Sequence, residues 1–297
     1  MQPVDLTFPS LDGRMLAGTV HAPAGSPLGA LVICSALGVP RPYYRRFATW
    51  MAARGVGVLT FDYRGVGGSL AGPLRDDPAT LLDWGRLDVT AAIDKARETW
   101  SGLPLWALGH SFGGQSFGIT PRGPDLAGAI VVAAGSGDLA LYPPALRRLY
   151  QFQLGVALPI VTALTGYVPG RFGIGADLPA GVVGQWARWC RTPGYARGAL
   201  GLDATHYHQI DAPMHFYDFP DDTFAPPAPS AELRSWYTGA RVTHRTITPR
   251  ELGLDKIGHF GFFRPGPTEA IWAELRAAVV GDHTVGHHTV GEDAAAS

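Results

Sequence analysis

The sequence contains only two cysteines, Cys34 and Cys190, among 297 residues. Two thiols are too few for the disulfide framework of a small secreted domain or for a cysteine-rich metal site. Cys34 lies in an apolar run, which predicts a buried thiol. A hydrophobic core must therefore hold the fold together, and the length suffices for one α/β domain with an insertion or for two small domains.

The sequence also lacks a charge imbalance and a long apolar stretch. Its formal net charge is −1, which disfavours a dedicated nucleic-acid-binding protein. No run of about 18 apolar residues occurs, so we expect no membrane span. The beginning, MQPVDLTFPSLDG, has no basic segment followed by an apolar core, so we expect no signal peptide and a soluble cytoplasmic protein.

The most informative stretch is LWALGHSFGGQSFG, residues 105–118. An apolar run ends at Gly109, and Ser111 and Gly113 follow in the pattern Gly-x-Ser-x-Gly. This pattern is typical of a nucleophile elbow, a sharp turn from strand to helix that presents a serine hydroxyl. Glycines two residues from the serine allow the strand and the helix to approach closely.

The same pattern occurs a second time, overlapping the first, around Ser116. Ser111 directly follows the apolar run, whereas Ser116 would lie inside the helix after it. We therefore interpret Ser111 as the nucleophile. The alternative is a glycine-rich helix start in which Ser111 is only a cap.

Short apolar runs alternate with helical patterns in the first half of the chain. This alternation predicts a doubly wound, mostly parallel sheet with right-handed crossovers. A hairpin around Asp12 and Gly13 precedes it. The expected strands are residues 4–8, 15–21, 30–34, 56–61, 103–108 and 126–134, and the expected helices are residues 43–54 and 78–100.

The alternation stops between residues 137 and 209, a segment rich in Pro, Gly, Tyr, Trp and Arg. Helices fit at 144–154 and 181–190, and no strand fits, so we expect a helical cap insertion. Strands at 212–217 and 241–247 and helices at 229–238 and 268–280 then complete the core. The expected division is a core of residues 1–136 and 210–281, a cap of 137–209 and a disordered tail of 282–297, whose three histidines also allow metal binding.

Two loops after late strands carry an acid and a histidine. The segments are DDTFAP, residues 221–226, and IGHFGFF, residues 257–263. A serine hydroxyl becomes nucleophilic when a base takes its proton, and the base needs an orienting acid. Ligands bind at the carboxyl ends of strands in open parallel sheets, so these loops and Ser111 should meet at one edge.

These segments, with FDYRGVGGS at residues 61–69, resemble the α/β-hydrolase superfamily in their expected order, over residues 31–134 and 212–280. DDTFAP with IGHFGFFR is similar to a bacterial subgroup of predicted serine hydrolases. The resemblance implies Ser111 as nucleophile, His259 as base and Asp222 as acid, four residues before Pro226. Asp221 and Asp138 remain alternative acids.

The resemblance also implies an oxyanion hole made of two backbone N–H groups. One belongs to Phe112, and the other comes from the loop after Cys34. Many relatives have His-Gly in that loop, whereas this chain has Ser-Ala-Leu-Gly. By position we choose Leu37, with Ala36 next. Asp62, Tyr63 and Arg64 are interpreted as structural.

The cap should form the pocket wall. Trp186 and Trp189 in the cap and Phe260 beside His259 are the expected substrate-binding residues, and they favour an apolar or aromatic acyl or alcohol group. Alternatively, the two tryptophans, which have helical spacing, anchor the cap to the sheet.

The leading hypothesis is a serine hydrolase that cleaves a carboxylic ester or thioester through an acyl-enzyme. The first alternative is an acyltransferase with the same triad and a non-water acceptor. The second is a catalytically silent binding protein. No cofactor is implied, because no phosphate-binding glycine loop or metal-ligand spacing is present. We expect a small-molecule substrate, and a homo-oligomer is left open.

Overall fold

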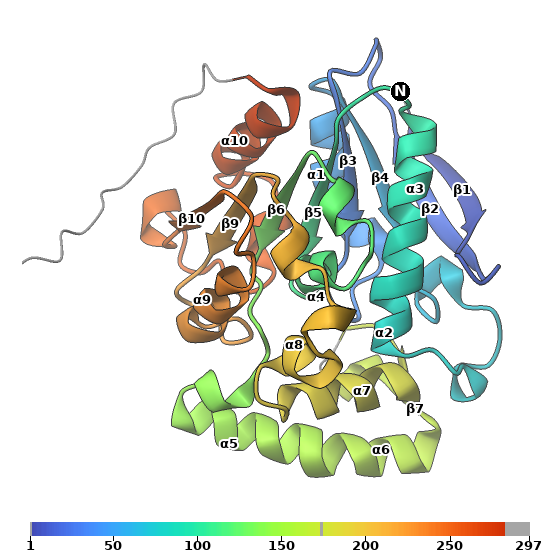
Figure 1. Cartoon of the computed structure of the whole chain (residues 1–297), viewed down its shortest axis with the longest axis vertical. Helices are drawn as coiled ribbons and strands as arrows, with labels where there is room; N and C mark the ends of the chain where they lie inside the picture. Colours follow the sequence, from blue (N-terminus) through green and yellow to red (C-terminus); the bar gives the residue numbers. More distant parts are fainter. Residues whose placement is uncertain (1, 173–174, 283–297) are drawn as a thin grey trace, which may run out of the picture.

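The computed structural model describes residues 2–172 and 175–282. Its centre is an eight-stranded sheet with the order β1-β2-β4-β3-β5-β6-β9-β10 (Figure 1). The six strands from β4 to β10 are parallel, and the β1–β2 hairpin adds antiparallel at one edge. The strands are β1 (Val4–Pro9), β2 (Met15–His21), β3 (Gly29–Cys34), β4 (Val56–Phe61), β5 (Leu105–His110), β6 (Gly128–Val132), β9 (Met214–Asp218) and β10 (Val242–Thr246). The predicted fold class is confirmed.

Helices cover both faces of the sheet, which explains why central strands such as β3 and β6 are apolar throughout. In β3, Leu31 and Ile33 pack on one face with α1 and α10, whereas Val32 and Cys34 pack on the other with α3 and α9. Side chains alternate along a strand, so a strand buried on both faces reads as a continuous apolar run. The helices of the core are α1 (Arg45–Ala52), α2 (Leu81–Asp83), α3 (Val89–Thr99), α4 (Phe112–Gln115), α9 (Pro227–Ser235) and α10 (Glu269–Val280).

The insertion lies across one end of the molecule, beneath the sheet in Figure 1. It contains α5 (Pro144–Phe152), a π-helical turn (Gln153–Ala157), α6 (Leu158–Thr165), α7 (Ala180–Cys190) and α8 (Tyr195–Leu200). The π-helical turn precedes Pro159, which has no N–H to donate four residues back, and Leu158 donates instead to the carbonyl of Gln153. A proline therefore sits inside what is one continuous helix from α5 to α6.

The expectation that this insertion has no strand is wrong. Strands β7 (Tyr167–Val168) and β8 (Leu178–Pro179) pair antiparallel. Each has two residues, too few for the alternation that identifies a strand in a sequence. The helix predicted at 144–154 also continues to Thr165, because the widened turn accommodates Pro159.

The contacts of Arg64 agree with its interpretation as a structural residue. Its guanidinium donates to the carboxylates of Asp88 and Asp12 and to the hydroxyl of Ser10, at 2.7 to 3.0 Å. These contacts join the β1–β2 turn to the segment before α3. Arg64 is therefore committed to holding the edge of the fold together.

Within residues 2–172 and 175–282, no helix is both long and apolar enough to cross a membrane. The same residues gather no cluster of three His, Cys, Asp or Glu side chains fit to hold a metal ion. The tail for which we expect disorder, and whose histidines raise metal binding, lies outside the described residues from 283 onward.

Candidate active site

Ser111 occupies a sharp turn between β5 and α4. Its backbone has φ 54° and ψ −116°, a region that residues with a side chain rarely adopt. The N–H of Ser111 donates to the carbonyl of Val132 at 3.0 Å, and its carbonyl accepts from Gly114 and Gln115, which starts α4. Strand β6 therefore holds the N–H of the strained residue, and helix α4 holds its carbonyl. Ser111 remains partly exposed.

The glycines of the motif are required by close backbone contacts. A Cβ added at Gly113 would lie 2.0 Å from the carbonyl oxygen of Cys34 in the neighbouring strand. One added at Gly109 would lie 2.3 Å from the nitrogen of Gly114. Both neighbours are backbone atoms that have no rotamer to change. The elbow therefore cannot close with larger residues at these positions.

The contact at Gly113 gives a first testable prediction. We expect Gly113→Ala to lower the free energy of unfolding by at least the ~1–3 kcal/mol typical of overpacking, measured by urea denaturation. Gly184→Ala is the matched control, since a Cβ there meets nothing within 4 Å. Gly184 lies in α7, so alanine should be neutral or stabilising by about 0.5–1 kcal/mol. Equal stability of Gly113→Ala and the wild type would contradict the close contact.

Ser116, the second match to the pattern, does not present its hydroxyl. Ser116 is fully buried, and its Oγ donates to the carbonyl of Gly113 at 2.6 Å. The structure thus distinguishes the two serines as the sequence interpretation expected.

Asp222 and His259 form a buried pair. The Nδ1 of His259 lies 2.7 Å from Oδ2 of Asp222, and their side chains are 6% and 0% exposed. The other carboxylate oxygen of Asp222 accepts the N–H groups of Phe224 and Ala225 at 2.8 and 3.2 Å. These bonds satisfy the carboxylate and fix its direction. An ionised acid at Nδ1 holds the proton there and leaves Nε2 of His259 free to act as a base.

The two alternative acids have other partners. Asp221 accepts the N–H groups of Ile257 and Gly258 through Oδ2, both at 2.9 Å, and so ties its own loop to the loop of His259. Asp138 accepts the N–H groups of Ala140 and Gly194. Both carboxylates therefore serve backbone geometry, whereas Asp222 contacts the imidazole.

His110, the residue before Ser111, connects the elbow to the loop of His259. Its Nε2 lies 2.8 Å from the carbonyl oxygen of His259, and its Nδ1 lies 2.9 Å from the hydroxyl of Tyr44. Tyr44 in turn accepts the N–H of Ala36 at 2.9 Å. Burial lowers the pKa of His110 well below its usual range and raises that of Tyr44, so both stay neutral.

The partners fix the direction of every bond in this relay. The carbonyl of His259 can only accept, so the neutral ring of His110 carries its proton on Nε2 and donates it there. Nδ1 of His110 therefore accepts from the hydroxyl of Tyr44, which itself accepts the N–H of Ala36. The relay holds the loop after β3, the elbow and the loop of His259 in one geometry. Neither Tyr44 nor His110 carried a signal in the sequence, because their contacts join segments far apart in the chain.

The two candidate oxyanion donors are free. In the part of the chain that the structure describes, the backbone N–H groups of Phe112 and Leu37 have no hydrogen-bond partner, whereas that of Ala36 is taken by Tyr44. The hydroxyl of Ser111 likewise bonds no described residue. Hydrogen bonds between a nucleophile and its base are often long without substrate and shorten when it binds.

Comparisons with known proteins agree with this architecture. Residues 25–166 match a family model described as serine aminopeptidase, S33. The esterase FrsA of Yersinia pestis (strain Pestoides F) is 32% identical over 80 residues, which are 26% of this chain and 19% of that esterase. The chain thus matches about a fifth of the length of this curated relative.

Solved structures match the whole chain. A monoglyceride lipase of Saccharomyces cerevisiae, solved as a soluble variant with a substrate analogue, has a TM-score of 0.64 and 15% identity over 96% of this chain and 97% of its own. A thermostable carboxyl esterase of Bacillus coagulans has a TM-score of 0.60 and 14% identity over 95% and 97%. The chain therefore has the α/β-hydrolase fold.

Aromatic rings lie close to the imidazole of His259. The ring of Phe260 is 37% exposed and its centroid lies 4.9 Å from that of His259. Phe224 lies 5.0 Å from the same imidazole and stacks on Tyr150 of α5. Phe224 and Tyr150 thereby place the cap helix over the histidine. Phe224 follows Asp222 by two residues in the DDTFAP motif. This closeness to the acid in the sequence could have identified Phe224 as a residue beside the histidine.

The two cap tryptophans have different environments. Trp189 is 3% exposed and packs edge-to-face on Tyr195, with centroids 5.7 Å apart. Trp186 is partly buried against the same core cluster. These contacts fit the alternative that the tryptophans anchor the cap to the rest of the fold.

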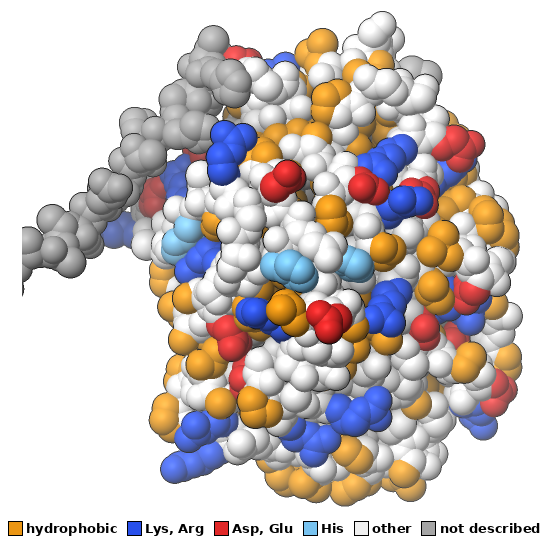
Figure 2. All heavy atoms as spheres, viewed as in Figure 1, with side chains coloured by type: hydrophobic (Ala, Val, Ile, Leu, Met, Phe, Trp, Pro, Cys, Tyr) orange, Lys and Arg blue, Asp and Glu red, His pale blue; other side chains and the backbone are white. Residues whose placement is uncertain are grey.

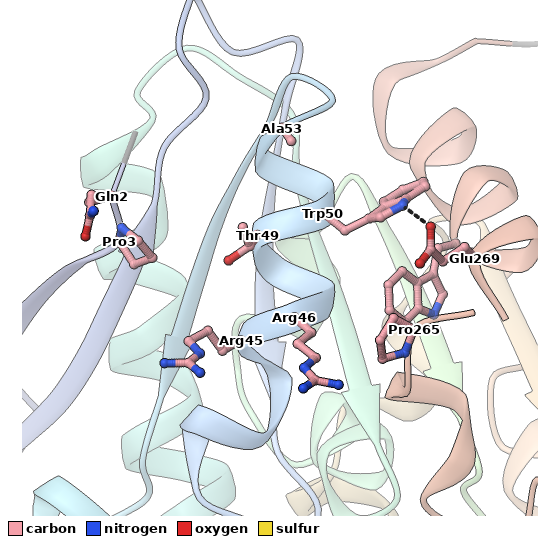
Figure 3. Close-up of a pocket in the computed structure, with 10 residues that line it drawn as sticks. Gln2, Pro3, Arg45, Arg46, Thr49, Trp50, Ala53, Pro265 and Glu269 are labelled. Carbon is pink, nitrogen blue, oxygen red and sulfur yellow. Dashed lines mark hydrogen bonds between the residues drawn. The ribbon is translucent and has the colours of Figure 1, made fainter. Parts of the chain in front are cut away.

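One open hollow of about 700 Å³ lies on the outer side of α1 (Figure 3). It is lined by Arg45, Arg46 and Trp50 of α1 and by Glu269 of α10. The indole N–H of Trp50 donates to Glu269 at 2.9 Å across it. None of the three triad candidates lines this hollow. It is therefore separate from the candidate active site.

Proposed function

We propose that this chain is a serine hydrolase that cleaves a carboxylic ester or thioester, with Ser111 as nucleophile, His259 as base and Asp222 as orienting acid. The observation that carries the proposal is the buried Asp222–His259 pair. The loop of His259 is hydrogen-bonded to His110, the residue directly before the strained serine. Structural neighbours described as esterase and lipase support the same class, at the level of the fold.

The proposed reaction has two halves. Oγ of Ser111 attacks the substrate carbonyl carbon while Nε2 of His259 takes the hydroxyl proton. The N–H groups of Phe112 and Leu37 bind the oxyanion, and each donor supplies roughly 3–4 kcal/mol. The intermediate collapses, His259 gives its proton to the leaving alcohol or thiol, and an acyl-enzyme remains.

In the second half His259 takes a proton from water, and the hydroxide attacks the acyl carbonyl. Collapse of this intermediate breaks the bond to Ser111 Oγ, which regains its proton from His259. The products are a carboxylic acid and the free enzyme. Asp222 stays ionised throughout and stabilises the imidazolium in each half.

The surroundings of His259 favour an apolar or aromatic group on the substrate. The rings of Phe224 and Phe260 lie 5.0 and 4.9 Å from the imidazole and 6.2 Å from each other, between centroids. We expect their faces to contact the acyl or alcohol portion near the scissile bond. Phe260 therefore keeps its proposed binding role, and Phe224 joins it.

A panel of p-nitrophenyl esters and acyl-thioesters tests the proposed function. We expect turnover of at least one ester or thioester class, with the carboxylic acid as the product in water. Added alcohol or amine should leave the amount of acid nearly unchanged. A product that shifts wholly to the new ester or amide would identify an acyltransferase, and no acyl-enzyme with any substrate would contradict the proposal.

The relay through Tyr44 gives a separate prediction. Tyr44→Phe keeps the buried ring but leaves the N–H of Ala36 and Nδ1 of His110 unpaired. We expect a loss of about 1–3 kcal/mol of stability and a fall of roughly tenfold in kcat with KM nearly unchanged, because the loop of His259 is less well placed.

Tyr237→Phe is the matched control for this change. The hydroxyl of Tyr237 is also buried and donates to the carbonyl of Gly114 at 3.1 Å, outside the relay. Tyr237→Phe should lose a similar amount of stability to Tyr44→Phe and keep the kcat of the wild type. An equal fall of kcat in both variants would show that the relay has no special role in positioning the histidine.

A further inference from the structure

The outer side of the cap helix carries a continuous apolar face. Its members, which we call the cap face, are spaced three or four residues apart from α5 to α6 and are between 45% and 82% exposed. Spacing of this kind places side chains on one side of a helix. The members are Leu149, Phe152, Val156, Ile160 and Leu164. On the opposite side of the same helix, Leu154 and Leu158 are buried in the core cluster.

The charged residues that flank the cap face along the chain all have one sign. No Asp, Glu, Lys or Arg occurs from residue 149 to residue 170, and no acidic residue occurs from 139 to 176. Arg147 and Arg148 precede the apolar stretch, and Arg171 follows it. In the described part of the chain these three arginines form no ion pair. Figure 2 shows hydrophobic and basic side chains together along the lower edge, where α5 and α6 lie.

We propose that the cap face docks on a lipid surface that carries anionic headgroups. A helix with exposed apolar side chains and basic flanks lies in the plane of such an interface, with its apolar side inserted and its cations at the headgroups. The inner side of the helix packs on the rest of the cap, so the helix does not need to cross the bilayer. The proposal concerns binding alone and does not depend on the hydrolase reaction.

The charge pattern disfavours a second copy of this chain as the occupant. A twofold contact brings the same patch of both copies together. The arginines flanking one cap face would then approach those of the other, without an acidic residue between 139 and 176 to pair with them. Like charges brought together in this way oppose association. Anionic headgroups supply the missing charges.

Vesicle co-sedimentation of the full chain tests the proposal. We expect binding to phosphatidylcholine vesicles that contain phosphatidylglycerol and weaker binding to phosphatidylcholine alone. High salt should weaken the binding, because it screens the arginines. The double variant Phe152→Gln/Ile160→Gln should bind at least tenfold more weakly. Both residues are exposed, so the fold should be unaffected, which thermal unfolding checks.

Leu28→Gln is the matched control, because Leu28 is 58% exposed and precedes β3, outside the cap. It should bind vesicles like the wild type. Absence of binding to anionic vesicles, or equal binding by the double variant, would overturn the proposal. Dimers in light scattering that the double variant abolishes, without vesicle binding by the wild type, would assign the cap face to a second copy instead.

Discussion

Ser111→Ala should lower kcat for ester hydrolysis by about six orders of magnitude, the loss seen when the nucleophile of a serine triad is removed. Alanine keeps the Cβ and the backbone of the strained turn and removes only the oxygen that would become acylated. Because the hydroxyl of Ser111 is partly exposed and bonds no described residue, the stability of the variant should match that of the wild type. Steady-state kinetics and thermal unfolding of the purified variant measure both quantities.

Ser116→Ala controls for the second serine of the motif. The buried hydroxyl of Ser116 donates to Gly113, so its removal should cost about 1 kcal/mol of stability and change kcat only a few-fold. A folded Ser111→Ala variant that retained wild-type turnover would refute the role of Ser111. If Ser116→Ala instead abolished turnover without unfolding, the nucleophile would be reassigned to Ser116.

Asp222→Asn should give the second largest effect, a fall in kcat of about 10⁴-fold. The carboxylate accepts a hydrogen bond from Nδ1–H of His259, whereas an amide that turns its NH₂ group toward the ring donates to Nδ1 and favours the tautomer with the proton on Nε2. That tautomer cannot take the proton of Ser111. The change preserves volume, and steady-state kinetics with the best ester of the panel measure it.

Asp138→Asn and Asp221→Asn distinguish the acids that the sequence left open. Asp221 accepts both of its backbone N–H groups on Oδ2, which the amide oxygen of asparagine can replace. Asp138 accepts one N–H group on each oxygen, so asparagine keeps only one of those two bonds. We expect kcat to stay within about tenfold of the wild type, since the imidazole keeps its tautomer. A loss of about 10⁴-fold in either variant, with an active Asp222→Asn, would move the acid role away from Asp222.

The central sheet could be predicted from the sequence because its strands are buried on both faces. Runs such as residues 30–34 and 56–61 contain no charged residue and only one polar residue, Thr60, and they became β3 and β4. The elbow could be predicted for a related reason. Its glycines meet backbone atoms at positions where no side chain fits, so the contact leaves a direct trace in the sequence.

Other parts of the molecule depend on contacts that leave no local pattern. Asp221 and Asp222 are adjacent, and the different backbone N–H groups that each carboxylate accepts fix which of them turns to the imidazole. The relay of Tyr44 and His110 joins residues 66 and 149 positions apart. Periodicity reports what a residue does within its own element, so it cannot report such long-range bonds.

The most direct test is to treat the folded wild-type protein with a fluorophosphonate and to locate the adduct by peptide mass spectrometry. Such a reagent phosphonylates only a serine that a base has activated. The account predicts one adduct, on Ser111, and none in Asp222→Asn under the same conditions. A folded protein that stays unlabelled, or one labelled at another serine, would contradict it.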